Sequence, residues 1–255
     1  LTYVRVWYGG EVIGDNNEIN GITFGGVGSG TTVSNIEVAF NQDDGVEFFG
    51  GTVDVKYLSV LFCGDDGIDT DEGYQGRIQF AFVMIGTDGH HATEMDSKNN
   101  EQPRSFPQVY NALFVGHVDN DPDSISSDDQ TPGMMRLREG TGGEFGSIIM
   151  TNIADLGVLQ NDCGSEERSS SLSAISNAKP DYLFFSSKNI MYSPNSFTPF
   201  SLDSCPGLTD AAVTDPQLRL MPTDATELTT LIDPRPVENG NSYEDYDAIP
   251  TDDFF

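Results

Sequence analysis

The most constraining feature of the sequence is an ungapped internal repeat near its beginning. Residues 35–51 are NIEVAFNQDDGVEFFGG and residues 57–73 are YLSVLFCGDDGIDTDEG, so equivalent positions lie 22 residues apart. In this register Ile36 matches Leu58, and the two Asp-Asp-Gly triplets coincide. Each copy holds two short β-rich segments separated by a Gly/Asp turn. A unit this small cannot bury its own apolar face, so the copies must stack on one another.

Further units follow the same pattern along the chain. Pairs of short β-rich segments begin near residues 78, 109, 146 and 181, and none has the period of a long amphipathic helix. The sequence therefore predicts an all-β parallel β-helix, a solenoid of about six or seven coils. A β-sandwich is the competing fold, and the fixed register argues against it. We expect the solenoid to cover residues 1–200 and a Pro/Asp-rich strap of the same domain to cover 201–255.

Two stretches resemble a known family. They are NGITFGGVGSGTTVSNIEVAFNQDDGVEFFGGTVDVKYL (20–58) and DEGYQGRIQFAFVMIG (71–86). Both are similar to secreted or cell-surface right-handed parallel β-helix proteins with the pectate-lyase-like fold, found in marine and Bacteroidetes-like bacteria and generally without an assigned function. The resemblance implies right-handed coils and a secreted or cell-surface protein. Because the chain begins within a predicted strand, we also expect it to be part of a longer protein.

The charge of the chain excludes several classes of partner. There are 41 acidic and 12 basic residues, a formal net charge of −29. Such a surface repels nucleic acids and anionic membranes. No apolar run approaches the roughly 20 residues that cross a bilayer, so membrane insertion is not expected either.

The repeat predicts that acidic side chains form a column across the stacked coils. Glu47 should lie beside Asp69, and Asp69 beside Glu94, at the spacing of neighbouring strands, about 4.8 Å. Like charges that face each other in a sheet destabilise it unless something compensates them. Aligning the next strand places Arg136 over Glu94, and Arg138 over Asp96. The simplest hypothesis is a structural ladder made of Glu47, Asp69, Glu94, Arg136 and Arg138.

Three other interpretations of this acidic region stay open. The first is a Ca²⁺ site, because carboxylate oxygens are the ligands that this ion prefers. Its candidate ligands are Asp65, Asp66, Asp69, Asp71 and Asp96. The second is a glycosidase-type pair of carboxylates, and the third is a lyase site that combines Ca²⁺ with an arginine and a base. The candidate catalytic residues are Asp69, Asp71, Glu94 and Arg136.

The histidines and cysteines allow narrower predictions. His90 and His91 are adjacent, and adjacent side chains on a strand point to opposite faces, so we expect a polar loop and no zinc site. Cys163 and Cys205 lie in turn-like surroundings and are predicted to form a disulfide, which suits an oxidising compartment. Cys63 ends an apolar run and is expected to pack as a buried thiol.

Two function classes follow from these observations. The first is an extracellular structural, adhesion or fibre module that binds a surface polysaccharide, with Ca²⁺ as its only expected cofactor. Such a module could also associate with copies of itself, head to tail, as a filament. The alternative is a polysaccharide lyase or glycoside hydrolase that acts on an acidic polysaccharide. The strong negative charge argues against an anionic substrate, although Ca²⁺ can bridge two anions.

Overall fold

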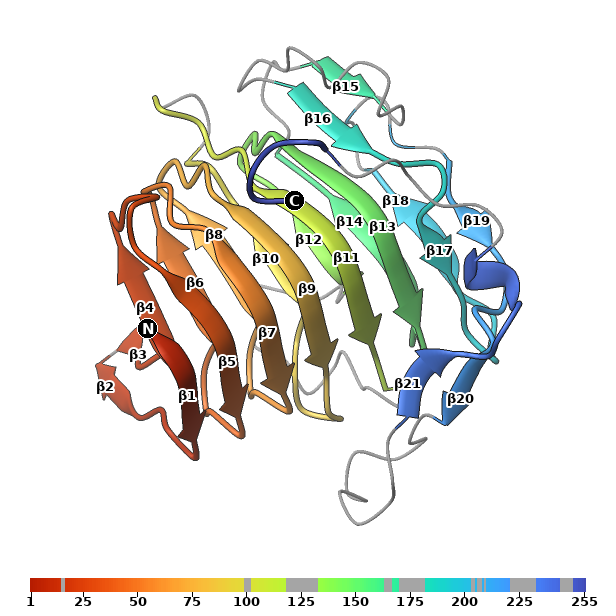
Figure 1. The fold of residues 1–255 in the computed structure, drawn as a ribbon, viewed down its shortest axis with the longest axis horizontal. Coiled ribbons are helices and arrows are strands. Elements are labelled where there is room, and N and C mark those ends of the chain that lie inside the picture. The colour runs from red at the N-terminus through yellow and green to blue at the C-terminus, as the bar shows by residue number, and fades with distance from the viewer. Residues whose placement is uncertain are drawn as a thin grey trace.

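The computed structural model of the chain describes residues 1–14, 17–98, 102–117, 133–162, 167–169, 182–202, 205, 208, 210–220, 233–243 and 250–255. The regular secondary structure of these residues is almost entirely β-strand, and the strands are stacked side by side along the longest axis of the molecule (Figure 1). None of them forms a long apolar helix of the kind that crosses a bilayer. The insertion at 118–132 and Cys163 lie outside the described residues.

Two large sheets make up the body of the molecule, and smaller pairs of strands flank them. The ten-stranded sheet contains β1 (Thr2–Trp7), β5 (Val33–Ala39), β7 (Val55–Leu61), β9 (Arg77–Met84), β11 (Gln108–Val115), β13 (Gly143–Thr151), β15 (Glu167–Ser169), β16 (Tyr182–Phe185), β17 (Ile190–Met191) and β19 (Ala212–Val213). The seven-stranded sheet contains β4 (Ile22–Gly25), β6 (Val46–Phe49), β8 (Ile68–Asp71), β10 (Thr93–Met95), β12 (Gly133–Leu137), β14 (Leu156–Gln160) and β18 (Thr198–Ser201). Antiparallel pairs form between β2 (Val12–Gly14) and β3 (Asn17–Glu18), and between β20 (Leu218–Leu220) and β21 (Asp233–Pro236).

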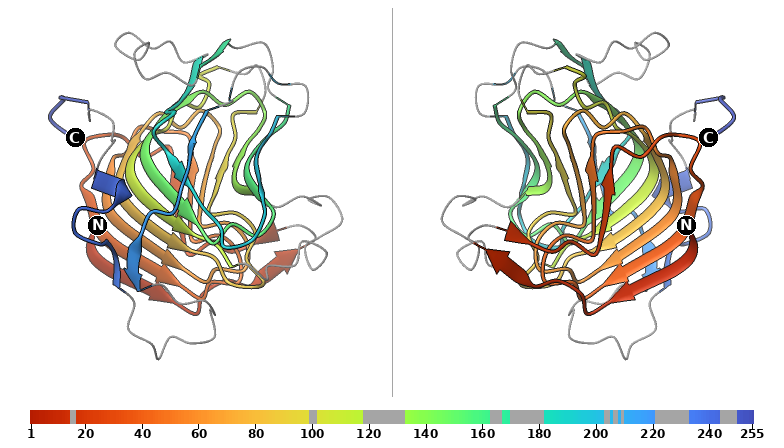
Figure 2. Two further views of the ribbon diagram at one scale, coloured as in Figure 1. Left: turned by 90° about the vertical axis from the view of Figure 1, so that its right-hand side faces the viewer. Right: turned by 90° about the vertical axis from the view of Figure 1, so that its left-hand side faces the viewer.

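From β4 to β14 the chain alternates between the two large sheets, one strand in each per coil, and β15, β16 and β17 then follow one another in the larger sheet. Neighbouring strands within both sheets are parallel, and views down the long axis show one coil behind another (Figure 2). The predicted 22-residue register is confirmed, because Ile36 of β5 lies opposite Leu58 of β7. The architecture is therefore the predicted right-handed parallel β-helix, and the seven strands of the smaller sheet agree with six or seven coils.

The core lies between the two sheets and repeats from coil to coil. Valine side chains at equivalent positions, Val38, Val60 and Val83, are buried one above another. On the other side of the core, the rings of Phe24 and Phe48 stack with centroids 5.1 Å apart, and Phe48 and Tyr74 stack at 4.5 Å. Burial of such columns supplies most of the favourable free energy of folding.

The strands of the larger sheet share a break in their pairing. In each of β1, β5, β7, β9, β11 and β13, one residue has φ between 54° and 60°. This residue does not pair with the neighbouring strand, whereas residues before and after it do. The residues with this φ are Tyr3, Asn35, Tyr57, Phe80, Asn111 and Ser147. A left-handed backbone costs a non-glycine residue about 1–3 kcal/mol. Its repetition in six coils places one column of side chains on the outer face of the sheet, which we call the outer column.

The C-terminal residues pack against the outer face of the larger sheet (Figure 1). Asp252 forms an ion pair with Arg77 at 3.0 Å, and the ring of Phe254 lies 4.6 Å from the cationic groups of both Lys56 and Arg77. Residues 241–243 form a short 3₁₀ turn, η3 (Asn241–Tyr243). Within 201–255, β19 belongs to the larger sheet, so the solenoid continues past residue 200; we call the other described residues of this segment the C-terminal strap.

Candidate functional site

The acidic side chains lie in one column of the smaller sheet. Glu47 of β6 is opposite Asp69 of β8, Asp69 is opposite Glu94 of β10, and Glu94 is opposite Arg136 of β12. The stacked repeats determine this order, because the strands of successive coils pair in register. These four residues therefore follow one another in the predicted order. The two halves of the column have different surroundings.

Arginines compensate the half of the column nearer the C-terminus. Arg136 donates to the Glu94 carboxylate at 2.8 Å, and both side chains are buried. Arg138 donates to Asp96 at 2.6 Å and lies 3.3 Å from Glu94. Burial and the nearby Glu94 raise the pKa of Asp96, while Arg138 lowers it. This half behaves as a charge-balanced structural ladder, in which each carboxylate accepts a charge-assisted hydrogen bond, although Oδ1 of Asp96 is buried with no hydrogen-bond partner.

The other half of the column has acids without such compensation. Carboxylate oxygens of Asp44, Glu47 and Asp69 all lie within 4.8 Å of one another. Burial is the largest cause that raises the pKa of Asp44, of Asp69 and of Glu47, the last to about 7. Asn20 donates a hydrogen bond to Glu47, and one oxygen of Asp69 is buried with no hydrogen-bond partner. We call Asp44, Glu47 and Asp69 the acidic pocket.

The acidic pocket opens into a groove of about 470 Å³. Its polar lining consists of Glu18, Asn20, Thr23, Asp43, Asp44 and Glu47. Burial, together with the charge of Asp65, raises the pKa of Asp43 to about 6. Carboxylates this close to one another must take up protons or a cation. Oxygen ligands at this density suit a hard cation such as Ca²⁺.

The five residues predicted to form one Ca²⁺ site do not lie together in the structure. Asp69 belongs to the acidic pocket, and Asp65 lies with Asp43 and Asp44. Asp66 faces His90 and His91, and Asp96 is held by Arg138. The prediction of one five-residue site is therefore wrong. Among the described residues, the ligand groups contain neither Asp71 nor Asp96, whereas Asp44 and Glu47 were not in the predicted set. The repeat itself could have indicated Asp44, because its triplet stacks on the next one.

The proposed catalytic residues are similarly separated. Glu94 and Arg136 bind each other, and the carboxylate of Asp71 accepts a hydrogen bond from the backbone N–H of Glu72. Only Asp69 lies in the uncompensated acidic pocket. The structure places Glu47 beside it, and of these two carboxylates Glu47 lines the groove.

The predicted loop is confirmed, because residues 85–92 form no strand. Its histidines are not solvated, however: His90 and His91 are both buried with their rings side by side, so they do not point to opposite faces as adjacent side chains on a strand would. Cys63 is a buried free thiol, as expected. Cys205 is disulfide-bonded, but Cys163 lies outside the described residues, so the pairing of Cys163 with Cys205 stays a prediction.

A second groove, which the sequence did not predict, lies on the outer face of the larger sheet. It has a volume of about 540 Å³ and is lined by Tyr3, Arg5, Asn35, Ile36, Glu37, Tyr57, Ser59 and Phe80. Four of these residues belong to the outer column. Tyr3 is 81% exposed, Tyr57 52% and Phe80 41%, and the rings of Tyr57 and Phe80 stack 5.1 Å apart. Asn35 stands between Tyr3 and Tyr57, so it leaves a slot between two aromatic rings.

A larger groove of about 700 Å³ continues past Phe80 along the same face. Its floor includes Asn111 and Ser147 of the outer column, and its far wall includes Arg235 and Tyr243 of the C-terminal strap. The lining is mostly apolar, with Lys188 and Arg235 as its cationic members. The two grooves share Phe80 in their linings and lie on the same face of the larger sheet.

Comparison with known proteins agrees with this architecture. No curated protein and no solved structure matches the chain. One family model, described as a pectate-lyase-like β-helix domain, matches residues 1–206. The matched part covers every strand of the two large sheets except β19. The chain belongs to the family of pectate-lyase-like β-helix domains.

Proposed function

We propose that this β-solenoid is an extracellular polysaccharide-binding module whose glycan lies along the outer grooves and whose acidic pocket binds Ca²⁺. The observation that carries the proposal is the exposed slot between Tyr3 and Tyr57, with Asn35 at its floor. Large exposed aromatic side chains with a polar residue between them are unusual on the surface of an isolated domain. They are suited to a ligand with both apolar faces and hydroxyl groups.

The dimensions of the slot fit one sugar ring. Tyr3, Asn35 and Tyr57 occupy successive coils, so Tyr3 and Tyr57 are two strand spacings apart, roughly 9.6 Å. A sugar ring midway between them would have its centre about 4.8 Å from each aromatic ring, one strand spacing away. Arg5 and Glu37, which pair at 3.3 Å, supply a donor and an acceptor beside the slot. The strained backbone of the outer column supports a functional role, because such strain concentrates at binding sites.

Binding to a panel of neutral and uronate polysaccharides tests this proposal. We expect Tyr3→Ala and Tyr57→Ala to weaken binding at least tenfold in calorimetry or affinity electrophoresis. Tyr8→Ala is the matched control, because Tyr8 is also an exposed aromatic residue but lies outside the groove. Equal binding by the two groove variants and the unsubstituted protein would contradict the proposal.

Calcium binding by the acidic pocket is tested separately. We expect CaCl₂ titrated into chelator-treated protein to bind saturably and to raise the melting temperature, because a ligand at 100 times its Kd stabilises by about 2.7 kcal/mol. Asp69→Asn should remove this effect, whereas Asp253→Asn, at an exposed carboxylate outside the pocket, should not. A melting temperature that Ca²⁺ leaves unchanged would reject the site.

An enzymatic role is the second candidate, and a specific observation favours it. Glu47 has a pKa raised to about 7 by burial and lies beside Asp69 at an open groove. A glycosidase needs one carboxyl that keeps its proton near neutral pH and a second carboxylate nearby. Loss of chain-cleaving activity in Glu47→Gln, with polysaccharide binding retained, would support this role. Absence of cleavage by the unsubstituted protein across the panel would leave the binding function alone.

The remaining features of the proposal concern location and assembly. The disulfide of Cys205 and the net charge of −29 are consistent with a secreted or cell-surface protein. Head-to-tail association of copies into a filament stays a prediction, and electron microscopy of concentrated protein checks it.

A further inference from the structure

A buried cluster of two histidines and an aspartate joins two neighbouring coils. Asp66 lies in the turn before β8, and His90 and His91 lie in the turn before β10. Asp66 accepts a hydrogen bond from the backbone N–H of His91 at 2.7 Å, and Gly67 donates to the carbonyl of His91 at 2.9 Å. These backbone contacts hold the two turns against each other. They bring side chains from different coils to one point.

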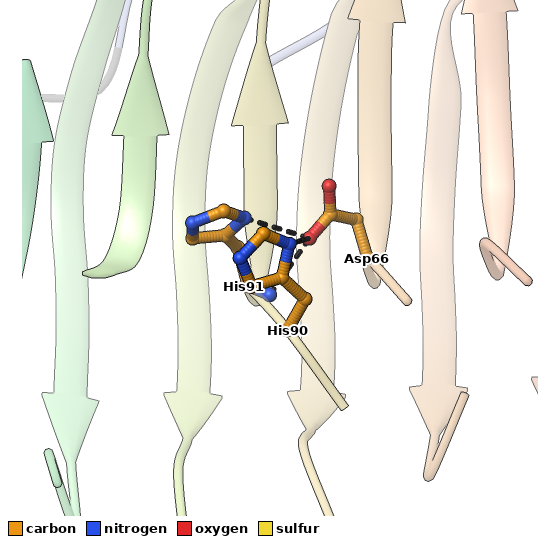
Figure 3. A group of neighbouring side chains, drawn as sticks. All are labelled: Asp66, His90 and His91. Carbon is orange, nitrogen blue, oxygen red and sulfur yellow. Dashed lines mark hydrogen bonds and ion pairs between the residues drawn. The ribbon is translucent and has the colours of Figure 1, made fainter. Parts of the chain in front are cut away.

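The turn directs both imidazoles to the same side of the chain. The ring centroids of His90 and His91 are 3.7 Å apart, and both Nδ1 atoms face one oxygen of Asp66 (Figure 3). His90 is 4% exposed and His91 1%, so the cluster is shielded from solvent. Two imidazoles that converge on one carboxylate in this way form a potential set of metal ligands.

The distances between the donor atoms match a tetrahedral metal centre. The Nδ1 atom of His91 is 2.9 Å from Asp66 Oδ1, and the Nδ1 atom of His90 is 3.8 Å from the same oxygen. His90 Nδ1 also lies 3.2 Å from Asp65 Oδ1. Bonds of about 2.0–2.1 Å in a tetrahedral Zn²⁺ site place neighbouring ligand atoms about 3.3 Å apart. The observed distances lie on both sides of that value.

The electrostatics of the cluster suit a divalent ion. Asp66 is 2% exposed and His91 1%, so water solvates neither side chain. A divalent cation bound by two carboxylates and two neutral imidazoles forms a neutral complex, which avoids the large cost of burying net charge.

The tautomers of the two histidines leave this ligand set available. The Nε2 atoms of His90 and His91 are buried and have no hydrogen-bond partner. The contact made by one ring nitrogen normally determines which nitrogen carries the proton. Nδ1 of His91 lies 2.9 Å from Asp66 Oδ1, and this hydrogen bond places the proton of the neutral ring on Nδ1 when no metal is bound. A metal bound at Nδ1 would take the place of this hydrogen bond, and the ring would then carry its proton on Nε2.

We propose that Asp66, His90 and His91 bind a first-row divalent transition-metal ion, Zn²⁺ in the first instance, with Asp65 as the outer ligand. Imidazole ligands favour this class of ion over Ca²⁺, so the site is chemically different from the acidic pocket. Asp65 is half exposed and provides a route of entry. The ion would link the turns of two successive coils and stabilise the solenoid at this point.

Titration of chelator-treated full-length protein with ZnSO₄ tests the proposal. We expect one Zn²⁺ per chain, a higher melting temperature and, with Co²⁺ as a probe, the absorption bands of a tetrahedral site. His90→Gln should weaken binding at least tenfold and abolish these bands. Asp65→Asn changes a half-exposed side chain and should also weaken binding, so the test does not depend on a buried substitution that unfolds the chain.

Two control variants distinguish this cluster from the third histidine and from the acidic pocket. His117→Gln removes a histidine that lies outside the cluster and should leave Zn²⁺ binding unchanged. Asp69→Asn should abolish Ca²⁺ binding and leave Zn²⁺ binding intact. The proposal is overturned if the unsubstituted protein binds no Zn²⁺, if His90→Gln and Asp65→Asn bind it normally, or if His117→Gln abolishes binding.

Discussion

At the scale of single residues, the unusual property of this protein is the number of carboxyl groups that are buried with a raised pKa. Asp44, Asp66 and Asp69 lie near one another, and Glu144 of β13 is a separate example. In each case burial is the largest cause, because removal from water disfavours the charged form. A carboxyl of this kind stabilises the folded protein when protonated and loses that contribution as the pH rises.

Glu144 gives the clearest prediction of pH dependence. It is 1% exposed, accepts a hydrogen bond from Gln108 at 2.6 Å, and has a pKa raised from 4.5 to about 7. Its contribution to stability should be complete below about pH 4.5 and lost as the pH rises through 7, a difference of up to about 3 kcal/mol. We expect Glu144→Gln to be more stable than the unsubstituted protein at pH 8 and similar to it at pH 5, in urea unfolding. Glu238→Gln removes the same charge at an exposed position, and an equal gain there would show that burial of Glu144 is not the cause.

At the scale of the elements, close backbone packing at one corner of each coil depends on glycine. Gly21, Gly45 and Gly67 occupy equivalent positions, and each donates to a carbonyl of the following coil. A Cβ atom at Gly45 would lie 2.2 Å from Val60 and 2.6 Å from the carbonyl oxygen of Gly67. Here glycine is required for space and not for its backbone angle, because the next coil covers the position directly.

Substitution of this glycine should therefore destabilise the stack. We expect Gly45→Ala to lower the free energy of unfolding by about 1–3 kcal/mol, as overpacking does in other cores. Gly28→Ala is the control, because no heavy atom lies within 4 Å of a Cβ built there, and its effect should stay within about 0.5 kcal/mol. Chemical denaturation measures both effects. If the two substitutions lower the free energy of unfolding equally, contact with the next coil is not the reason for the destabilisation.

At the scale of the whole molecule, a net charge of −29 acts on every coil. The two arginines of the ladder neutralise only its own acids, and unpaired acids elsewhere repel one another. The range of this repulsion depends on salt, since the Debye length falls from about 30 Å at 0.01 M to about 3 Å at 1 M.

Monovalent salt alone should stabilise the solenoid. We expect the melting temperature in the presence of a chelator to rise steadily between 0.01 and 1 M NaCl, because screening reduces repulsion in the folded state more than in the expanded chain. Scanning calorimetry measures this directly. A melting temperature that falls with NaCl would mean that the favourable ion pairs, such as Arg138 with Asp96, outweigh the net repulsion.

The fold and the order of the acidic column could be predicted because both follow from the repeat. Once the coils stack in register, Glu47, Asp69 and Glu94 must lie side by side, and the next strand must bring Arg136 to the end of the column. The grooves could not be predicted in this way. They depend on one left-handed residue per strand, and neither Tyr57 nor Phe80 belongs to a residue type that signals such a conformation.

What the sequence determined by itself is the periodic part of this protein: the parallel strands, their register and the columns that the register creates. These features can be predicted from the sequence because, in a stack of coils in register, each residue lies beside the equivalent residue of the next coil. Only the tertiary structure decided that Asp44, Glu47 and Asp69 share one pocket, and that His90 and His91 turn together toward Asp66. The physical reason is that burial and side-chain direction depend on turns and on the closing strap, which the repeat does not specify.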